Sequence, residues 1–165
     1  MVGGVALALG GFLDRTTLDV DVIAVAPGDE AELRAADPLP SPLTEAVLTV
    51  ARDYGLAPSW FNGVVSAQLE HGLPPGWFEE LRWLRFGALE VGLAGRRGLI
   101  ALKLFAAADQ DRNSKHVSDL VALAPTEREW SEASAWVVTQ DQAPEFPAQV
   151  RRIVEHVDER LGRSS

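Results

Sequence analysis

The sequence predicts an α+β (mixed α/β) protein in which residues 1–95 form a small mixed sheet with flanking helices and residues 96–165 form a helical half. Two patterns carry this prediction. Apolar and polar residues alternate in short segments of the first half, as in half-buried strands, whereas apolar residues recur at helical spacing through the second half. With 165 residues, 47% hydrophobic and 24% charged, the chain is long enough for a single domain with its own core.

In the first half, a helix and a strand come before a longer loop. Glycine pairs bound an apolar helix at residues 3–11, and the segment LDVDVIAVA at 18–26 has the alternation of a strand. The proline- and aspartate-rich loop at 27–42 is expected to hold one short helix. The remaining expectations for this half are a helix at 43–53 that stops at Gly55, a helix at 59–70, and a turn at 71–76.

In the second half, a pair of strands leads into a series of helices. The strands are predicted near RWLRF (82–86) and ALEVGLA (88–94), broken at Gly87. Helices are predicted at 96–108, at 114–124, after a capping box formed by Thr126 and Glu129, and at 147–161.

Composition excludes several classes of function. The chain has no cysteine, so a disulfide framework and a thiolate metal site are both excluded, and its three histidines are too widely spaced to form a metal motif. The net charge of −9 argues against a general nucleic-acid binder. The apolar first thirteen residues lack a basic leader and are too short to span a bilayer, so we expect a cytoplasmic protein that makes no use of a membrane.

Two aspartates give the strongest chemical signal. Asp19 and Asp21 are two residues apart on the predicted strand, so both carboxylates should emerge on one face, about 7 Å apart. A divalent cation relieves their repulsion, and Mg²⁺ (or Mn²⁺) typically binds one or two carboxylates together with substrate phosphates. A solvated edge strand is the competing interpretation, because isolated pairs of this kind are common on exposed strands.

Neighbouring residues favour the metal interpretation. Gly3 and Gly4 open the first helix, where backbone N–H groups could cradle a phosphate, and Arg15 and Thr17 lie between that helix and the strand. The stretch resembles the signature of minimal nucleotidyltransferases, in which a glycine pair precedes an R-x-T-x-D-x-D strand entry. It is similar in particular to the AbiEii-type toxins of abortive-infection systems and allied nucleotidyltransferase domains.

The resemblance continues to about residue 124. Those families carry an L-I-x-L-K-x-x-A helix, matched here by residues 99–106 with Lys103, and then an R-x-x-K/R-D-x-x-D-L helix. Residues 112–120 match the second motif, from Arg112 through Lys115 to Asp119 and the following leucine. The resemblance implies that Lys103 and Lys115 lie near nucleotide phosphates and that Asp119 organises the second helix. Lys115 and Asp119 are also spaced for an ordinary surface ion pair.

The sequence departs from the family pattern at three points. The apolar strand that normally leads into the glycine pair is missing, and His116 replaces an aspartate. The third carboxylate of the superfamily is assigned to Glu90, for which an outward-facing strand glutamate is the alternative.

The tryptophans allow two interpretations. They could stack on bases, an interpretation strongest for Trp83 beside its arginines, or anchor a core. The five are Trp60, Trp77, Trp83, Trp130 and Trp136.

The resemblance implies transfer of a nucleoside monophosphate from a nucleoside triphosphate to an acceptor hydroxyl, on tRNA or on a protein, with a cognate antitoxin as partner. Two alternatives stay open. One is a non-catalytic protein of the same fold that binds a nucleotide or a protein. The other is an interaction module whose helix at 147–161 docks another protein or a second copy, as in a homo-oligomer; packing on its own core explains that helix equally.

Overall fold

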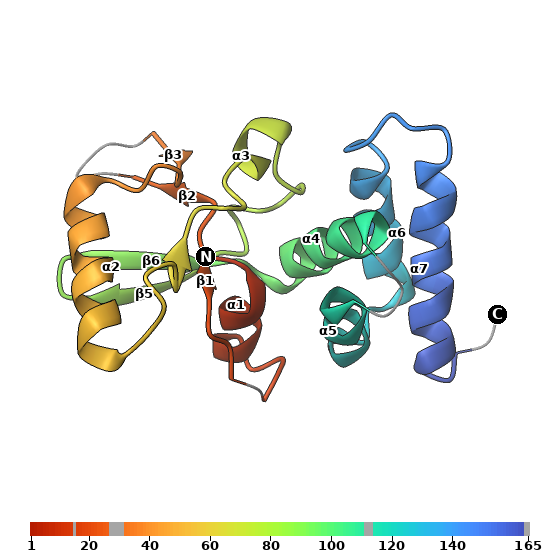
Figure 1. Cartoon of the computed structure of the whole chain (residues 1–165). Coiled ribbons are helices and arrows are strands. Elements are labelled where there is room, and N and C mark those ends of the chain that lie inside the picture. Colours follow the sequence, from red (N-terminus) through yellow and green to blue (C-terminus); the bar gives the residue numbers. More distant parts are fainter. Residues whose placement is uncertain (15, 27–31, 111–113, 164–165) are drawn as a thin grey trace. The chain divides into compact units, whose positions relative to one another are not determined.

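A computed structural model describes residues 1–14, 16–26, 32–110 and 114–163 (Figure 1). Within them the protein is α+β, as predicted, with seven helices and three two-stranded sheets. The chain divides into two compact units. The sheet unit comprises Met1–Leu73 and Arg82–Ala94, and the helical unit comprises Pro74–Leu81 and Gly95–Ser165.

The first part of the sheet unit is built around residues 20–25. Strand β1 (Val20–Asp21) pairs in parallel with β4 (Phe61–Asn62), and β2 (Ala24–Val25) pairs antiparallel with β3 (Arg34–Ala35). The predicted strand at 18–26 is therefore two short strands that pair with different partners. Helix α1 (Gly3–Leu9) contacts β1, and α2 (Ser41–Tyr54) ends at Gly55, whose φ of 66° is the left-handed conformation of a helix stop.

Met1 and Val2 form a short segment that bonds to strands on both sides before Gly3. The Met1 nitrogen donates to the Gly92 carbonyl, and the Met1 carbonyl accepts from Ala94 N–H. On the other side, Val2 N–H donates to the Asp21 carbonyl at 2.9 Å and forms an antiparallel bridge. The extended chain thus runs into Gly3 between β1 and the hairpin of β5 (Arg82–Phe86) and β6 (Leu89–Leu93).

One expectation for the first half is wrong. The helix predicted at 59–70 is strand β4, a turn and the short helix α3 (Gln68–His71). At Gly63 a side chain would overlap the backbone of Ala36, so this segment is held by a close backbone approach that apolar spacing does not reveal. In the described part of the 27–42 loop, residues 34–35 form strand β3. Residues 27–31 lie outside the described residues, so the short helix expected in this loop stays a prediction.

The helical unit is organised around α4 (Arg96–Asp109), which contacts α5 (Lys115–Leu123), α6 (Glu127–Val137) and α7 (Phe146–Arg160) (Figure 1). The predicted ends of α4, α5 and α7 agree with the structure to within one residue. Helix α6 begins after Thr126, as the predicted capping box with Glu129 requires, and both hydrogen bonds of that box are present. The apolar stripe of α7 is buried within this unit at Val150, Ile153 and Val157. Packing on its own core therefore accounts for the stripe, as the second interpretation of that helix required.

No helix among the described residues has the length and apolar character needed to cross a membrane.

Candidate functional site

The glycine pair lies directly against two of the predicted site residues. Gly3 has a φ of 71°, and a side chain there would overlap the carboxylate oxygen Oδ2 of Asp21. A side chain at Gly4 would place its Cβ 2.9 Å from Oγ1 of Thr17. Contacts that close are possible only because glycine has no Cβ. The structure therefore brings together three parts of the motif that are up to eighteen residues apart in the sequence.

Thr17 also orders the entry to β1. Its hydroxyl donates to the backbone carbonyl of Asp19 at 3.2 Å. Asp19 is exposed just before the strand, and Asp21 is half-buried at its end. Alternation along an extended chain predicts that both aspartate side chains point to the same face. The cluster in the sheet unit formed by these side chains and glycines is called the glycine-pair cluster. Its five members are Gly3, Gly4, Thr17, Asp19 and Asp21.

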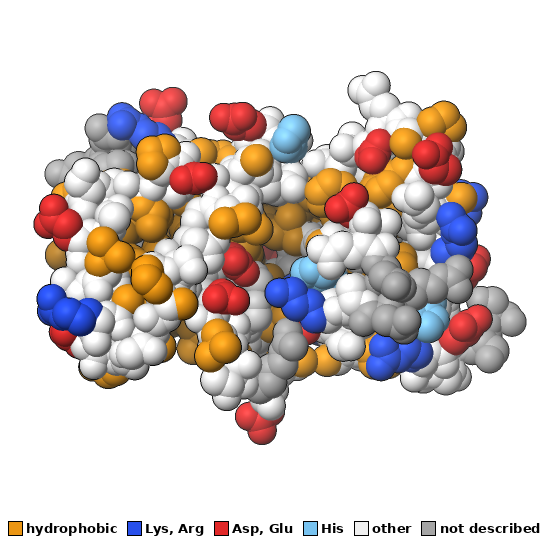
Figure 2. Space-filling model, viewed as in Figure 1, with side chains coloured by type: hydrophobic (Ala, Val, Ile, Leu, Met, Phe, Trp, Pro, Cys, Tyr) orange, Lys and Arg blue, Asp and Glu red, His pale blue; other side chains and the backbone are white. Residues whose placement is uncertain are grey.

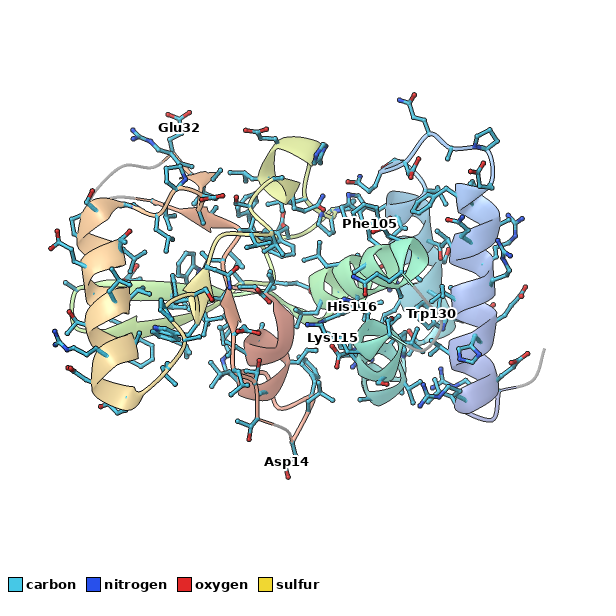
Figure 3. All side chains as sticks on the ribbon, viewed as in Figure 1. Asp14, Glu32, Phe105, Lys115, His116 and Trp130 are labelled. Atoms are coloured by element: carbon cyan, nitrogen blue, oxygen red, sulfur yellow. The ribbon has the colours of Figure 1, made fainter. Side chains whose placement is uncertain are left out.

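Arg15, the remaining residue of the R-x-T-x-D-x-D motif, lies outside the described residues, as does Arg112 of the downstream motif. Asp14, just before Arg15, is exposed in the loop that follows α1 (Figure 3). It offers a neighbouring carboxylate that does not belong to the cluster.

Glu90 is part of the β5–β6 hairpin. It lies directly opposite Arg85 in the register of the two strands, and the two exposed side chains form an ion pair. Among the described residues, no three acidic or histidine side chains lie close enough together to hold a metal ion by themselves, so the structure does not group Glu90 with the two aspartates in this way. The assignment of Glu90 as third carboxylate stays a prediction, and the ion pair gives it a structural role on the hairpin.

Lys103 and Asp119 form a buried ion pair in the helical unit. Lys103 Nζ lies 2.7 Å from Asp119 Oδ2, and their side chains are only 8% and 1% exposed. Asp119 is therefore not part of a surface bridge, which corrects the expectation drawn from its spacing to Lys115. Lys115 is exposed at the first residue of α5, next to His116 (Figure 3). Both residues were singled out from the sequence. Their contact was not predicted, because it depends on how α4 and α5 pack.

The five tryptophans differ in exposure, and Trp60 is half-buried. Trp77, Trp130 and Trp136 are buried in the helical unit, whereas Trp83 on β5 is 60% exposed. Only Trp83 thus has the exposure that stacking on a ligand requires.

A cavity of about 570 Å³ lies in the helical unit, between the end of α4 and the start of α7. Three acidic residues, Asp109, Asp141 and Glu145, line it together with one arginine, Arg152. This negative lining disfavours a triphosphate, and none of the predicted site residues takes part in it.

Comparison of the chain with protein-family models, with curated proteins and with solved structures found no match.

Proposed function

We propose that this protein is a nucleotidyltransferase that moves a nucleoside monophosphate from a nucleoside triphosphate to an acceptor hydroxyl. The observation that supports the proposal most is the glycine-pair cluster. Asp21 and Thr17 pack against Gly3 and Gly4, so the separate parts of the nucleotidyltransferase-like motif lie at one place in the fold. The acceptor would be tRNA or a protein, and the toxin resemblance adds a cognate antitoxin as a proposed partner.

The donor set of the cluster fits a divalent metal. Asp19 and Asp21 supply carboxylate oxygens, the ligand type that Mg²⁺ and Mn²⁺ prefer, and Asp19 is open to solvent and hence to a bound nucleotide. When bound, the metal would offset negative charge on the triphosphate and on the two carboxylates. Thr17 would keep Asp19 in position through its bond to the Asp19 carbonyl.

In the transfer, the acceptor oxygen forms a bond to the α-phosphorus while the bond to pyrophosphate breaks, and the hydroxyl proton passes to a base. The chain's task is to align these groups and to balance phosphate charge. Gly3 and Gly4 are proposed to contribute backbone N–H groups, and Arg15 a side-chain cation. The phosphate contacts that the resemblance implies for Lys103 and Lys115, which belong to the helical unit, stay predictions. Local cations of this kind are needed in a chain whose net charge is −9.

A second candidate is a non-catalytic protein of the same fold that binds a nucleotide or a protein. The Arg85–Glu90 ion pair favours it, because a glutamate held by an arginine on an exposed hairpin is a poor third carboxylate. The buried Lys103–Asp119 pair favours it as well, since that lysine is already neutralised by a carboxylate.

Calorimetric titration with ATP, GTP, CTP and UTP, each with Mg²⁺, tests the proposal. We expect saturable binding of at least one nucleotide to the wild type, and a loss of about tenfold or more in affinity for Asp19→Asn and for Asp21→Asn. Asp14→Asn is the matched control, because it removes an exposed carboxylate from the adjacent loop. It should bind as the wild type does.

The outcomes separate a functional from a structural Asp21. A carboxylate beside the start of α1 also stabilises that helix. If Asp21 has only this structural role, Asp21→Asn should lower the free energy of unfolding. If no nucleotide binds to well-folded wild type, the enzyme proposal is wrong. Binding without any pyrophosphate release in the presence of tRNA and protein acceptors would favour the non-catalytic candidate.

A further inference from the structure

The β5–β6 hairpin leaves one of its edges open. Gly87, with a φ of 61°, is the first residue of its two-residue turn, as a type II′ turn requires. On the β6 side, Gly92 and Ala94 bond to Met1. On the β5 side, β6 is the strand's only sheet partner among the described residues.

The register identifies which backbone groups face outward from β5. Phe86 and Leu89 close the two-residue turn and form a hydrogen-bonded pair, and hydrogen-bonded pairs alternate with non-hydrogen-bonded ones along an antiparallel hairpin. The N–H and C=O groups of Trp83 and Arg85 therefore point away from β6. The bond from the Met1 nitrogen to the Gly92 carbonyl confirms this alternation, because Gly92 lies opposite Trp83 and its carbonyl also points outward.

Large apolar side chains remain exposed on this hairpin. Trp83, Phe86 and Leu89 are 60%, 63% and 52% exposed. Apolar side chains also reach the viewed surface of the sheet unit around α2 (Figure 2). An open strand edge flanked by exposed aromatic residues is a ready template for pairing with another strand.

We infer that β5 pairs antiparallel with β5 of a second copy of this chain, about a two-fold axis at Leu84. This inference is independent of the proposed nucleotidyl transfer. The sequence Arg82-Trp83-Leu84-Arg85-Phe86 is self-complementary in this arrangement. Each arginine lies opposite an aromatic residue of the other copy, Arg82 opposite Phe86 and Arg85 opposite Trp83, and the leucines face each other.

Backbone geometry selects the same register. With Leu84 on the axis, the outward groups of Trp83 meet those of Arg85 in the other copy, which allows four main-chain hydrogen bonds. Moving the axis to Arg85 keeps the hydrogen bonding but sets Arg85 against itself, a repulsive like-charge pair. Moving it to Trp83 removes the contact between Arg85 and an aromatic ring.

Pairing also matches the charges of the hairpin. An arginine over an aromatic face gains a cation–π interaction, which strengthens as water is excluded. Arg85 already forms an ion pair with Glu90 of its own hairpin, so its charge stays compensated in the dimer. The product is a four-stranded sheet, β6–β5–β5–β6, with an interface that is identical on both copies.

Cysteine cross-linking tests this register in a chain that has no cysteine of its own. On the axis, the two Leu84 residues form a non-hydrogen-bonded pair with Cα atoms about 4.5 Å apart, within the range of a disulfide. Leu84→Cys should therefore give a covalent dimer on mild oxidation. Phe86→Cys is the matched control on the same face of the same strand, and it should give no covalent dimer because it lies opposite Arg82 of the other copy.

Sedimentation of the protein at increasing concentration provides a second test that needs no disulfide. The wild type should show a concentration-dependent dimer. Trp83→Arg places an arginine opposite Arg85 of the other copy, so it should raise the dimer Kd at least about tenfold. The double variant Trp83→Arg/Arg85→Trp restores each arginine–tryptophan pair, so it should recover dimerisation. A wild type that is monomeric at every concentration, or equal cross-linking of both cysteine variants, would overturn the inference.

Discussion

At the scale of single residues, the buried Lys103–Asp119 pair has the largest expected effect on stability. Asp119→Asn leaves the Lys103 ammonium buried without its carboxylate, which costs about 3 kcal/mol or more of unfolding free energy. Lys103→Met/Asp119→Leu replaces the whole pair by apolar groups and should cost less than about 1.5 kcal/mol. Urea unfolding followed by circular dichroism measures both. Lys115→Met, an exposed change on the same helix, should stay within about 0.5 kcal/mol of the wild type.

The double variant also addresses function, because it should fold without a cation at position 103. If Lys103 holds a nucleotide phosphate, the folded double variant will bind Mg²⁺-nucleotide more weakly than the wild type. Equal destabilisation of Asp119→Asn and the double variant would instead contradict the account of the pair as a buried ion pair.

The candidate site could be predicted from the sequence only where its residues are local. The spacing of Asp19 and Asp21 is enough to put them on one face of an extended segment. Their relation to Gly3 could not be deduced, since Asp21 reaches Gly3 through the pairing of Val2 with β1. Likewise, the Lys103–Asp119 contact joins two helices whose packing angle no local pattern specifies.

At the scale of elements, the start of α6 depends on a charged cluster. Arg96 Nε donates to Glu129 Oε1 at 2.7 Å, and Thr126 N–H donates to Glu129 Oε2 at 2.8 Å. The hydrogen bond from Arg96, helped by those from Thr126, lowers the pKa of Glu129 from 4.5 to about 2. Arg96 also donates to the Leu123 carbonyl at 2.7 Å, so this cluster ties α4 to the end of α5 and the start of α6.

This lowered pKa predicts an acid-sensitive contribution to stability. The folded-state pKa lies below the unfolded one, so the contribution is fully present above about pH 4.5 and is lost as the pH falls toward 2. Between pH 6 and pH 3 the wild type should lose about 2 kcal/mol through this group. Urea unfolding at the two values should show Glu129→Gln to be much less stable than the wild type at pH 6, and closer to it at pH 3.

Glu127→Gln is the control, because Glu127 is an exposed acid in the same first turn. It removes an acid from the same turn while leaving the hydrogen bonds of Glu129 in place. A Glu129→Gln variant that is as stable as the wild type at pH 6 would show that the cluster does not stabilise α6.

The elements themselves differ in how far they could be predicted. Helices α4, α5 and α7 have apolar faces and clear ends, so their sequence patterns were sufficient, and the start of α6 was predicted from its capping box. Strand β4 has two residues and exists because Phe61 and Asn62 pair in parallel with β1. Its neighbours Trp60, Val64 and Val65 are spaced like a helical stripe, yet Val64 is 81% exposed. Local spacing fails where a distant strand supplies the hydrogen bonds.

At the scale of the whole molecule, the chain passes between its two units three times. Residues 74–81 belong to the helical unit although sheet-unit residues precede and follow them. Two contacts attach this segment to α4: an ion pair between Arg97 and Glu80, and the packing of Trp77 over Gly98. The sequence divides the chain near residue 95 but gives no sign that this earlier segment joins the helices.

The contact between Trp77 and Gly98 predicts an unusual sign for a glycine substitution. Gly→Ala in a helix normally stabilises, by up to about 1 kcal/mol in the interior and by less in the first turn, where Gly98 lies. Here the added Cβ would lie 2.7 Å from the ring of Trp77, a rigid side chain that is buried, and such overpacking costs about 1–3 kcal/mol. Gly98→Ala should therefore destabilise the protein by about 1 kcal/mol and change tryptophan fluorescence. In a Trp77→Leu background the same substitution should be neutral or stabilising, because the clash is gone. A stabilised Gly98→Ala single variant, measured by urea unfolding, would show that residues 74–81 are not held against α4 as described.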